Sequence, residues 1–279
     1  MHLDAGELQS FYDRDLGQIA RRFIRARLRE VWPNVKGMSV LGLGFATPYL
    51  RPFQGEAARL IALMPAQQGV AYWPARDGNL AALADESALP LPDASIDRVI
   101  IAHVLETTET LRPLLRQVWR ILTPSGRVVV IAPNRTSLWA QVETTPFGHG
   151  RPFTRTQLNR LLTDAMFTPT AATGCLHMPP FGAGFLVRNG TRWERWGQRI
   201  WPQIAGVHLM ELTKEVMALA PDRGLRQRVP AKPVLVRPSP KATAGLVDAH
   251  QPSDAPAQER YEARRASKKI ALSAVKLSQ

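Results

Sequence analysis

Two carboxylates and one histidine stand where apolar runs break off, and these residue types could do chemistry. Asp85 and Glu86 occupy a loop before Leu89. In an open α/β sheet, ligands bind outside the carboxyl ends of the strands, where a carboxylate can accept a hydrogen bond from a ligand amino group. His103 ends an apolar run over 98–104, and an imidazole titrates near neutrality, which suits a general base. The alternatives are a solvated loop acid and a histidine that only packs or lines a pocket.

A second candidate is the turn at the end of the apolar run 40-VLGLGFATPYL-50. Gly42 and Gly44 suit a backbone that approaches a ligand closely and offers N–H donors. Ala46 adds a Cβ where another glycine would be expected, and this is tolerable if its φ is negative. The turn therefore lies where a ligand-binding loop is expected, but it has fewer glycines than such a loop usually has.

The residues that follow this turn predict a short helix. Pro48 removes a donor and restricts Thr47 to an extended conformation. We expect Thr47 to be the N-cap and Pro48 the first helical residue. Pro52 then shortens the helix to little more than one turn.

A polar loop, 146-PFGHGRPFTRTQL-158, is a third candidate. His149 and Arg151 could bind an anionic or polar substrate, and Asn134 follows a predicted strand and could line the same pocket. The equally favoured alternative is a structural turn that leads into a helix capped by Thr154.

Alternating apolar runs predict the elements that position these residues. Helical spacing of apolar residues indicates helices, and short buried runs indicate strands. The expected helices are 7–31, 112–124, 154–167 and 191–203, and the expected strands are 38–43, 59–64, 98–104, 127–132 and 207–212. Strands that alternate with helices predict a doubly wound α/β fold with a mostly parallel sheet covered on both faces.

Composition predicts three regions in the 279 residues: an N-terminal helical cap (1–35), an α/β domain (36–220) and a basic tail (221–279). The net charge is +13. The tail holds 12 Lys and Arg against five Asp and Glu, with few large apolar residues, so we expect it to be disordered. Basic surface attracts acidic partners or proteins, although a solvated tail is the simpler interpretation.

Several function classes are not favoured by the sequence. One cysteine, Cys175, leaves no internal disulfide, and no Cys/His spacing predicts a metal site. No apolar run has the length of a membrane span, and the start of the chain lacks the pattern of a signal peptide. These features predict a cytoplasmic protein.

The run 84-ADESALPLPDASIDRVIIAHVLETTETLRPLLRQVWRILTPSGRVVVIAPN-134 resembles the class I S-adenosylmethionine-dependent methyltransferases. It is most similar to the type 11 branch of small-molecule methylases, which includes the quinone-biosynthesis methylases. The resemblance implies a Rossmann-like fold, S-adenosylmethionine as cofactor and methyl transfer to a small molecule. It also implies an adenine contact for Asp85 with Glu86, a cofactor loop at Gly42, Gly44 and Ala46, and a cofactor cover that includes Tyr12.

The chain departs from the family's pattern at two cofactor anchors. Gly42 stands where the family has an acid, and Met64 or its neighbour stands where a second acid would hold the ribose hydroxyls. Tyr12, Gln67 and Gln68 are the candidate replacements. The losses favour an alternative, a catalytically inactive methyltransferase-like protein that serves as a binding or regulatory partner through its tail or the helix 14–30.

The sequence also argues against one substrate class. After the predicted strand 127–132, the segment 131-IAPNR-135 lacks the Asn/Asp-Pro-Pro-aromatic motif of amino-group DNA methyltransferases. Methylation of DNA bases is therefore not expected.

Overall fold

The computed structural model describes residues 3–74, 78–180, 194, 197, 199 and 204–215. Its helices, including the 3-10 turns η1 to η3, are α1 (Ala5–Asp13), α2 (Asp15–Val31), α3 (Thr47–Leu50), η1 (Arg51–Phe53), α4 (Leu111–Ile121), η2 (Leu138–Gln141), η3 (Pro146–Gly148) and α5 (Arg155–Asp164). Its strands are β1 (Ser39–Gly44), β2 (Arg59–Pro65), β3 (Ala81–Ala84), β4 (Ile96–Ala102), β5 (Leu122–Pro133), β6 (Phe167–Cys175) and β7 (Val207–Lys214). The predicted tail and most of the predicted helix 191–203 lie outside the described residues.

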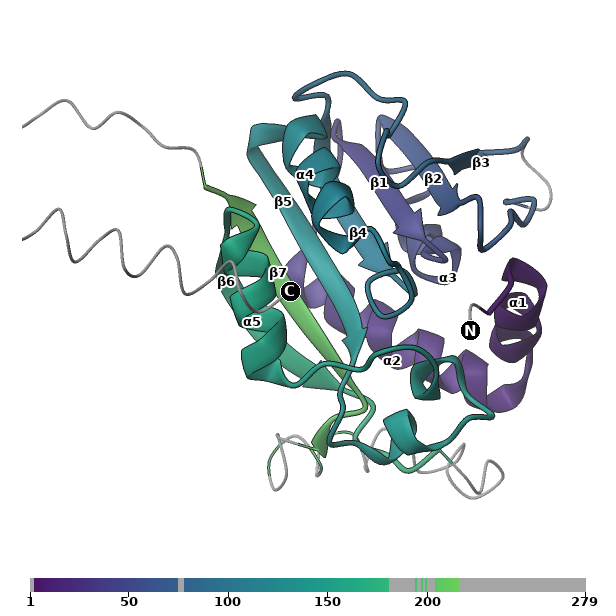
Figure 1. Cartoon of the computed structure of the whole chain (residues 1–279). Coiled ribbons are helices and arrows are strands. Elements are labelled where there is room, and N and C mark those ends of the chain that lie inside the picture. The colour runs from purple at the N-terminus through teal and green to yellow at the C-terminus, as the bar shows by residue number, and fades with distance from the viewer. Residues whose placement is uncertain are drawn as a thin grey trace, which may run out of the picture. The chain divides into compact units, whose positions relative to one another are not determined.

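The strands form one seven-stranded sheet in the order β3-β2-β1-β4-β5-β7-β6 (Figure 1). The strands from β3 to β5 pair in parallel, and β7 pairs antiparallel with both β5 and β6. The chain reverses its direction of travel across the sheet between β1 and β4, so their carboxyl ends open a crevice of the kind that binds ligands in such folds. The predicted doubly wound, mostly parallel α/β fold is confirmed.

Helices cover both faces of the sheet, as the alternation of side chains along buried strands requires. Val40 of β1 packs in the same cluster as Ile24 and Leu28 of α2. Its neighbour Leu41 points to the opposite face and packs in the cluster that holds the buried residues of α4 and α5. Figure 1 shows α4 and α5 in front of the sheet and α2 behind it.

The single helix expected over 7–31 is wrong, because the structure has two helices there. Arg14 is extended, with ψ at 159°, and separates α1 from α2. Gly17 lies so close to the end of α1 that a Cβ would overlap the carbonyl oxygen of Phe11. The break lets α1 turn over the strand ends while α2 runs along the sheet, which one straight helix could not do.

Two smaller expectations about helix ends are also corrected. Ala46, not Thr47, is the N-cap of α3, and Pro48 lies in its first turn. Thr154 does cap α5, since its hydroxyl accepts a hydrogen bond from Gln157 N at 3.2 Å. That helix ends before residue 167 because Met166 has a φ of 65° and Phe167 starts β6.

Candidate functional site

The turn after β1 is packed into the core. A Cβ on Gly42 would meet Leu50 Cδ1 at 2.6 Å and Ala46 Cβ at 3.0 Å, so a larger residue there needs the Leu50 side chain to shift. Gly44 has a φ of 77°, and a Cβ on it would overlap the carbonyl oxygen of Ala102 on β4. Packing and backbone conformation thus require glycine at position 44, whereas Gly42 is closely packed by side chains alone.

A buried hydrogen-bond network fills the crevice between β1 and β4. His103 directly follows β4, and its Nε2 lies 2.6 Å from the hydroxyl of Tyr12 on α1. The Tyr12 hydroxyl also lies 2.5 Å from that of Tyr49 on α3. Phe45 stacks on Tyr12, and the Phe147 ring is centred 5.3 Å from the His103 ring. Residues far apart in the sequence are therefore joined at the carboxyl edge of the sheet.

The protonation of this network follows from its burial. Burial first, then the charge of Tyr49, raises the pKa of Tyr12 well above its usual value, and burial likewise raises the pKa of Tyr49. Both phenols stay protonated near neutral pH. The direction of the bond between Tyr12 and His103 Nε2 is set by the imidazole tautomer. On the other side of the ring, Nδ1 lies 3.4 Å from Glu106 Oε1.

Two buried acceptors beside His103 lack hydrogen-bond donors among the described residues. Neither carboxylate oxygen of Glu106 has a hydrogen-bond partner, because its approach to His103 has ion-pair distance without hydrogen-bond geometry. Gln68 donates from Nε2 to His103 O at 2.8 Å, yet its Oε1 is unpaired. Buried polar groups are normally satisfied, so such acceptors call for a reason. Glu106 was not predicted from the sequence. The available signal was an acid that directly follows an apolar run, three residues after His103.

Asp85 and Glu86 lie in the loop after β3 and are held locally. Asp85 is exposed, and its Oδ1 accepts hydrogen bonds from Ser87 Oγ and Ser87 N, both at 2.7 Å. The Ser87 hydroxyl first, then the Ser87 backbone, lowers the pKa of Asp85. Glu86 accepts from the hydroxyls of Thr108 and Thr110 in the segment after β4. The second oxygen of the ionised Asp85 carboxylate, Oδ2, can therefore accept a hydrogen bond from a ligand.

The expected substrate residues lie in the segment between β5 and α5. Arg151 donates its backbone N–H to Glu106 O at 2.7 Å, and its side chain is exposed. His149 donates from Nε2 to Glu143 O at 2.6 Å. Asn134 is buried and donates to Ala205 O at 2.7 Å, so its amide supports the turn after β5. The structure brings the backbone of the Arg151 loop next to Glu106 in the His103 network, and it places Asn134 at the end of β5 with its amide bonded to the backbone of Ala205.

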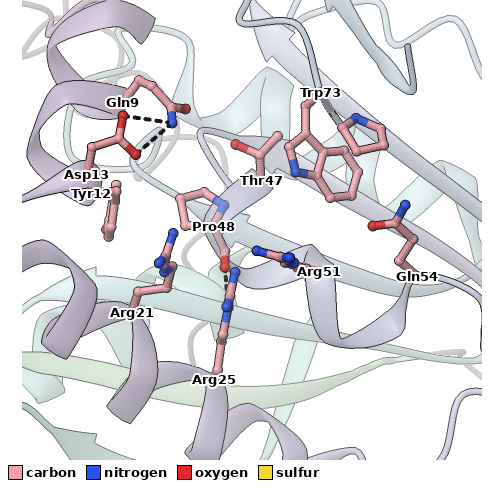
Figure 2. A pocket seen from close by; sticks show the side chains of 11 residues that line it. Gln9, Tyr12, Asp13, Arg21, Arg25, Thr47, Pro48, Arg51, Gln54 and Trp73 are labelled. Atoms are coloured by element: carbon pink, nitrogen blue, oxygen red, sulfur yellow. Dashed lines mark hydrogen bonds between the residues drawn. The ribbon is translucent and has the colours of Figure 1, made fainter. Parts of the chain in front are cut away.

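A cavity of about 530 Å³ opens beside this network, between the N-terminal helices and the segment after β1 (Figure 2). Its lining residues are Gln9, Tyr12, Asp13, Arg21, Arg25, Thr47, Pro48, Arg51, Gln54, Trp73 and Pro74. Tyr12 therefore touches both the cavity and His103. Sequence reasoning did not assign this cavity, because its residues come from α1, α2, α3 and the segment after β2.

Among the described residues, no group of three or more His, Cys, Asp or Glu side chains could hold a metal ion. Within the same part of the chain, no helix is both long and apolar enough to cross a membrane.

The sheet order and its crevice define the fold of the class I methyltransferases, and comparison with known proteins agrees. Residues 40–130 match the family model described as a methyltransferase domain. A probable S-adenosylmethionine-dependent methyltransferase of Mycobacterium tuberculosis is 37% identical over 98 residues, which cover 34% of this chain and 35% of that protein. The match thus spans about a third of that relative's length.

Solved structures show the same fold at low sequence identity. An S-adenosylmethionine-dependent methyltransferase from Thermotoga maritima, described as a possible histamine N-methyltransferase, has a TM-score of 0.50 at 17% identity. The match covers 76% of this chain and 95% of that one. A cyclase has a TM-score of 0.50 at 19% identity, with 72% of this chain and 82% of that chain covered. The fold by itself therefore does not decide the reaction.

Proposed function

We propose that the chain is an S-adenosylmethionine-dependent methyltransferase that acts on a small molecule. The observation that carries the proposal is a pair of buried acceptors, Glu106 and Gln68, at the crevice of a methyltransferase fold. They flank His103, and their unpaired oxygens have no donor in the described part of the chain. Gly42 stands where the resemblance predicts an acid, and these two acceptors would supply the contacts that the loop lacks. Glu106 would take the cationic methionine end of the cofactor, and Gln68 would take a ribose hydroxyl.

The remaining anchors are consistent with this assignment. Asp85 is ionised and exposed after β3, where a carboxylate can accept from the adenine amino group. Gly44 brings the β1 backbone close to β4. The cofactor, when bound, supplies an electrophilic methyl group, and the protein contributes mainly position.

His103 is the proposed general base. In the tautomer that carries its proton on Nδ1, that N–H faces Glu106, and the carboxylate would stabilise the imidazolium that forms when Nε2 takes a proton from the methyl acceptor. Nε2 is hydrogen-bonded to the Tyr12 hydroxyl, so the methyl acceptor reaches Nε2 only when Tyr12 moves away. Helix α1, which carries Tyr12, would therefore act as the cover of the site.

The test is calorimetric titration of the ligand-stripped protein with S-adenosylmethionine and S-adenosylhomocysteine. Binding in the micromolar range is expected. The His103→Asn variant should bind as tightly as the wild type, because its proposed role lies in proton transfer. No binding at millimolar ligand would contradict the proposal.

A second candidate is a methyltransferase-like protein that has lost its chemistry and serves as a binding or regulatory partner. The observation that favours it is the aromatic filling of the crevice, since Tyr12, Phe45 and Tyr49 are each at most 1% exposed. Its contact surface would be the basic tail or the segment 14–30. Absence of cofactor binding together with specific capture of a partner by the full chain, lost when 221–279 is deleted, would support it.

A further inference from the structure

The cavity beside Tyr12 gathers positive charge that the proposed methyl transfer does not use. Figure 2 shows Arg21 and Arg25 from α2 close to Arg51, which follows α3. Asp13 is the one acidic residue in the lining, and its carboxylate accepts from Gln9 Nε2 at 3.2 and 3.3 Å. The lining thus holds three guanidinium groups and a single carboxylate, which is already hydrogen-bonded to Gln9.

The arginines are poorly compensated by the rest of the described chain. Arg25 donates from Nε to Pro48 O at 2.5 Å, a neutral acceptor. Among the described residues, Arg21 and Arg51 form no ion pair, in contrast to Arg29 on the same helix, which pairs with Glu56. Burial first, then the charges of Arg21 and Arg51, lowers the pKa of Arg25 to about 10. An anion between the three groups would relieve this repulsion.

We propose that this arginine pocket binds the phosphate group of a phosphorylated small molecule. A phosphate carries close to two negative charges and three acceptor oxygens, which match converging guanidinium groups better than a single carboxylate does. Thr47 adds a hydroxyl to the lining, and the Trp73 indole adds a flat apolar wall for the organic part of the ligand. A volume of about 530 Å³ is in the range of small-molecule sites.

Asp85, Gln68 and Glu106, the proposed polar contacts of the cofactor, are absent from the lining of this pocket, whereas Tyr12 of the proposed cover is part of it. The pocket shares only Tyr12 with the His103 network. The inference does not rest on the proposed methyl transfer, since a phosphate site can be measured without S-adenosylmethionine.

The experiment is calorimetric titration of the full chain with phenyl phosphate and with benzoate, which has the same ring and a smaller charge. Phenyl phosphate should bind at least about tenfold more tightly. Arg21→Gln and Arg51→Gln should each weaken phenyl phosphate binding by about tenfold, as expected for the loss of one charge-assisted contact. Arg25 is left unchanged because its Nε supports the α3 backbone.

Arg22→Gln is the matched control, because Arg22 neighbours Arg21, is exposed and does not line this cavity. It should change the affinity less than about twofold, and all three variants should keep the wild-type melting temperature. An equal effect of Arg22→Gln would reduce the pocket to non-specific basic surface. Displacement of phenyl phosphate by S-adenosylhomocysteine would assign the arginines to the cofactor carboxylate. Either result, or equal binding of benzoate, would overturn the proposal.

Discussion

The turn after β1 and the loop after β3 are both expected to contact the cofactor, yet the structure builds them in opposite ways. The chain is buried without interruption from Val40 on β1 through the turn to Leu50 on α3, and this stretch forms part of the core. In the loop after β3, Asp85 is exposed and accepts hydrogen bonds from Ser87, two residues away. The first segment is held by tertiary packing and the second by local hydrogen bonds.

This difference separates stability from ligand binding. A change in the turn after β1 alters the packing of α1 and β4 as well as any cofactor contact. A change at Asp85 alters little except the carboxylate itself. Substitutions within 42–48 would therefore report on the core as well as on binding, while Asp85 offers a cleaner test of binding.

The largest expected effect is on folding, from Phe45→Ala. Phe45 is fully buried and stacks on Tyr12, so truncation should lower the free energy of unfolding by about 3–5 kcal/mol. Urea denaturation measures it. Ser87→Ala in the other loop serves as the comparison and should cost less than about 1 kcal/mol. Similar values for the two variants would remove the contrast between the segments.

Asp85→Ala should lower affinity for S-adenosylhomocysteine by about ten- to a hundredfold, because a hydrogen bond to a charged group is lost. The melting temperature should stay unchanged, since Asp85 is exposed. Calorimetry and thermal unfolding measure the two quantities. Glu109→Ala is the control, an exposed acid in the segment after β4. Unchanged affinity in Asp85→Ala would remove Asp85 from the site.

Glu106→Gln should weaken S-adenosylhomocysteine binding by about tenfold without loss of stability. The amide keeps the shape of the side chain and removes a buried charge that has no hydrogen-bond partner in the described structure. Titration and urea denaturation of one preparation give both numbers. Loss of stability at unchanged affinity would make Glu106 a structural partner of His103 only.

Ser87→Ala gives the smallest effect, on the pKa of Asp85. Removal of the hydroxyl should raise that pKa toward its ordinary value, because Ser87 is the main cause of its lowering. A depressed carboxyl pKa stabilises the fold above the unfolded-state pKa, and this contribution disappears as the pH falls through the folded-state value. The free energy of unfolding of the variant should therefore be lower than that of the wild type at neutral pH, and the two values should become equal in acid. Carboxyl carbon NMR titration checks the shift, and a constant difference at all pH values would contradict it.

Strong hydrophobic runs made much of the fold predictable. β1, β4 and β5 are long apolar segments, and α4 keeps Leu114, Leu115 and Val118 on one buried face. The strands β3 and β6 were missed because an alanine-rich segment and one with Pro169 and Gly174 carry weak strand signals. Their pairing with β2 and β7 outweighs local preference.

Among the candidate site residues, the sequence by itself placed His103 at a strand end and Asp85 in a loop before Leu89, since both positions follow from local apolar patterns. It could not join Tyr12, Tyr49 and His103, reveal Glu106 as a buried acceptor, or gather Arg21, Arg25 and Arg51 around one cavity. Those groupings depend on the break at Arg14, which sets where α1 lies against the strand ends. Periodicity reports which face of an element is buried, and only the packed fold decides what that face meets.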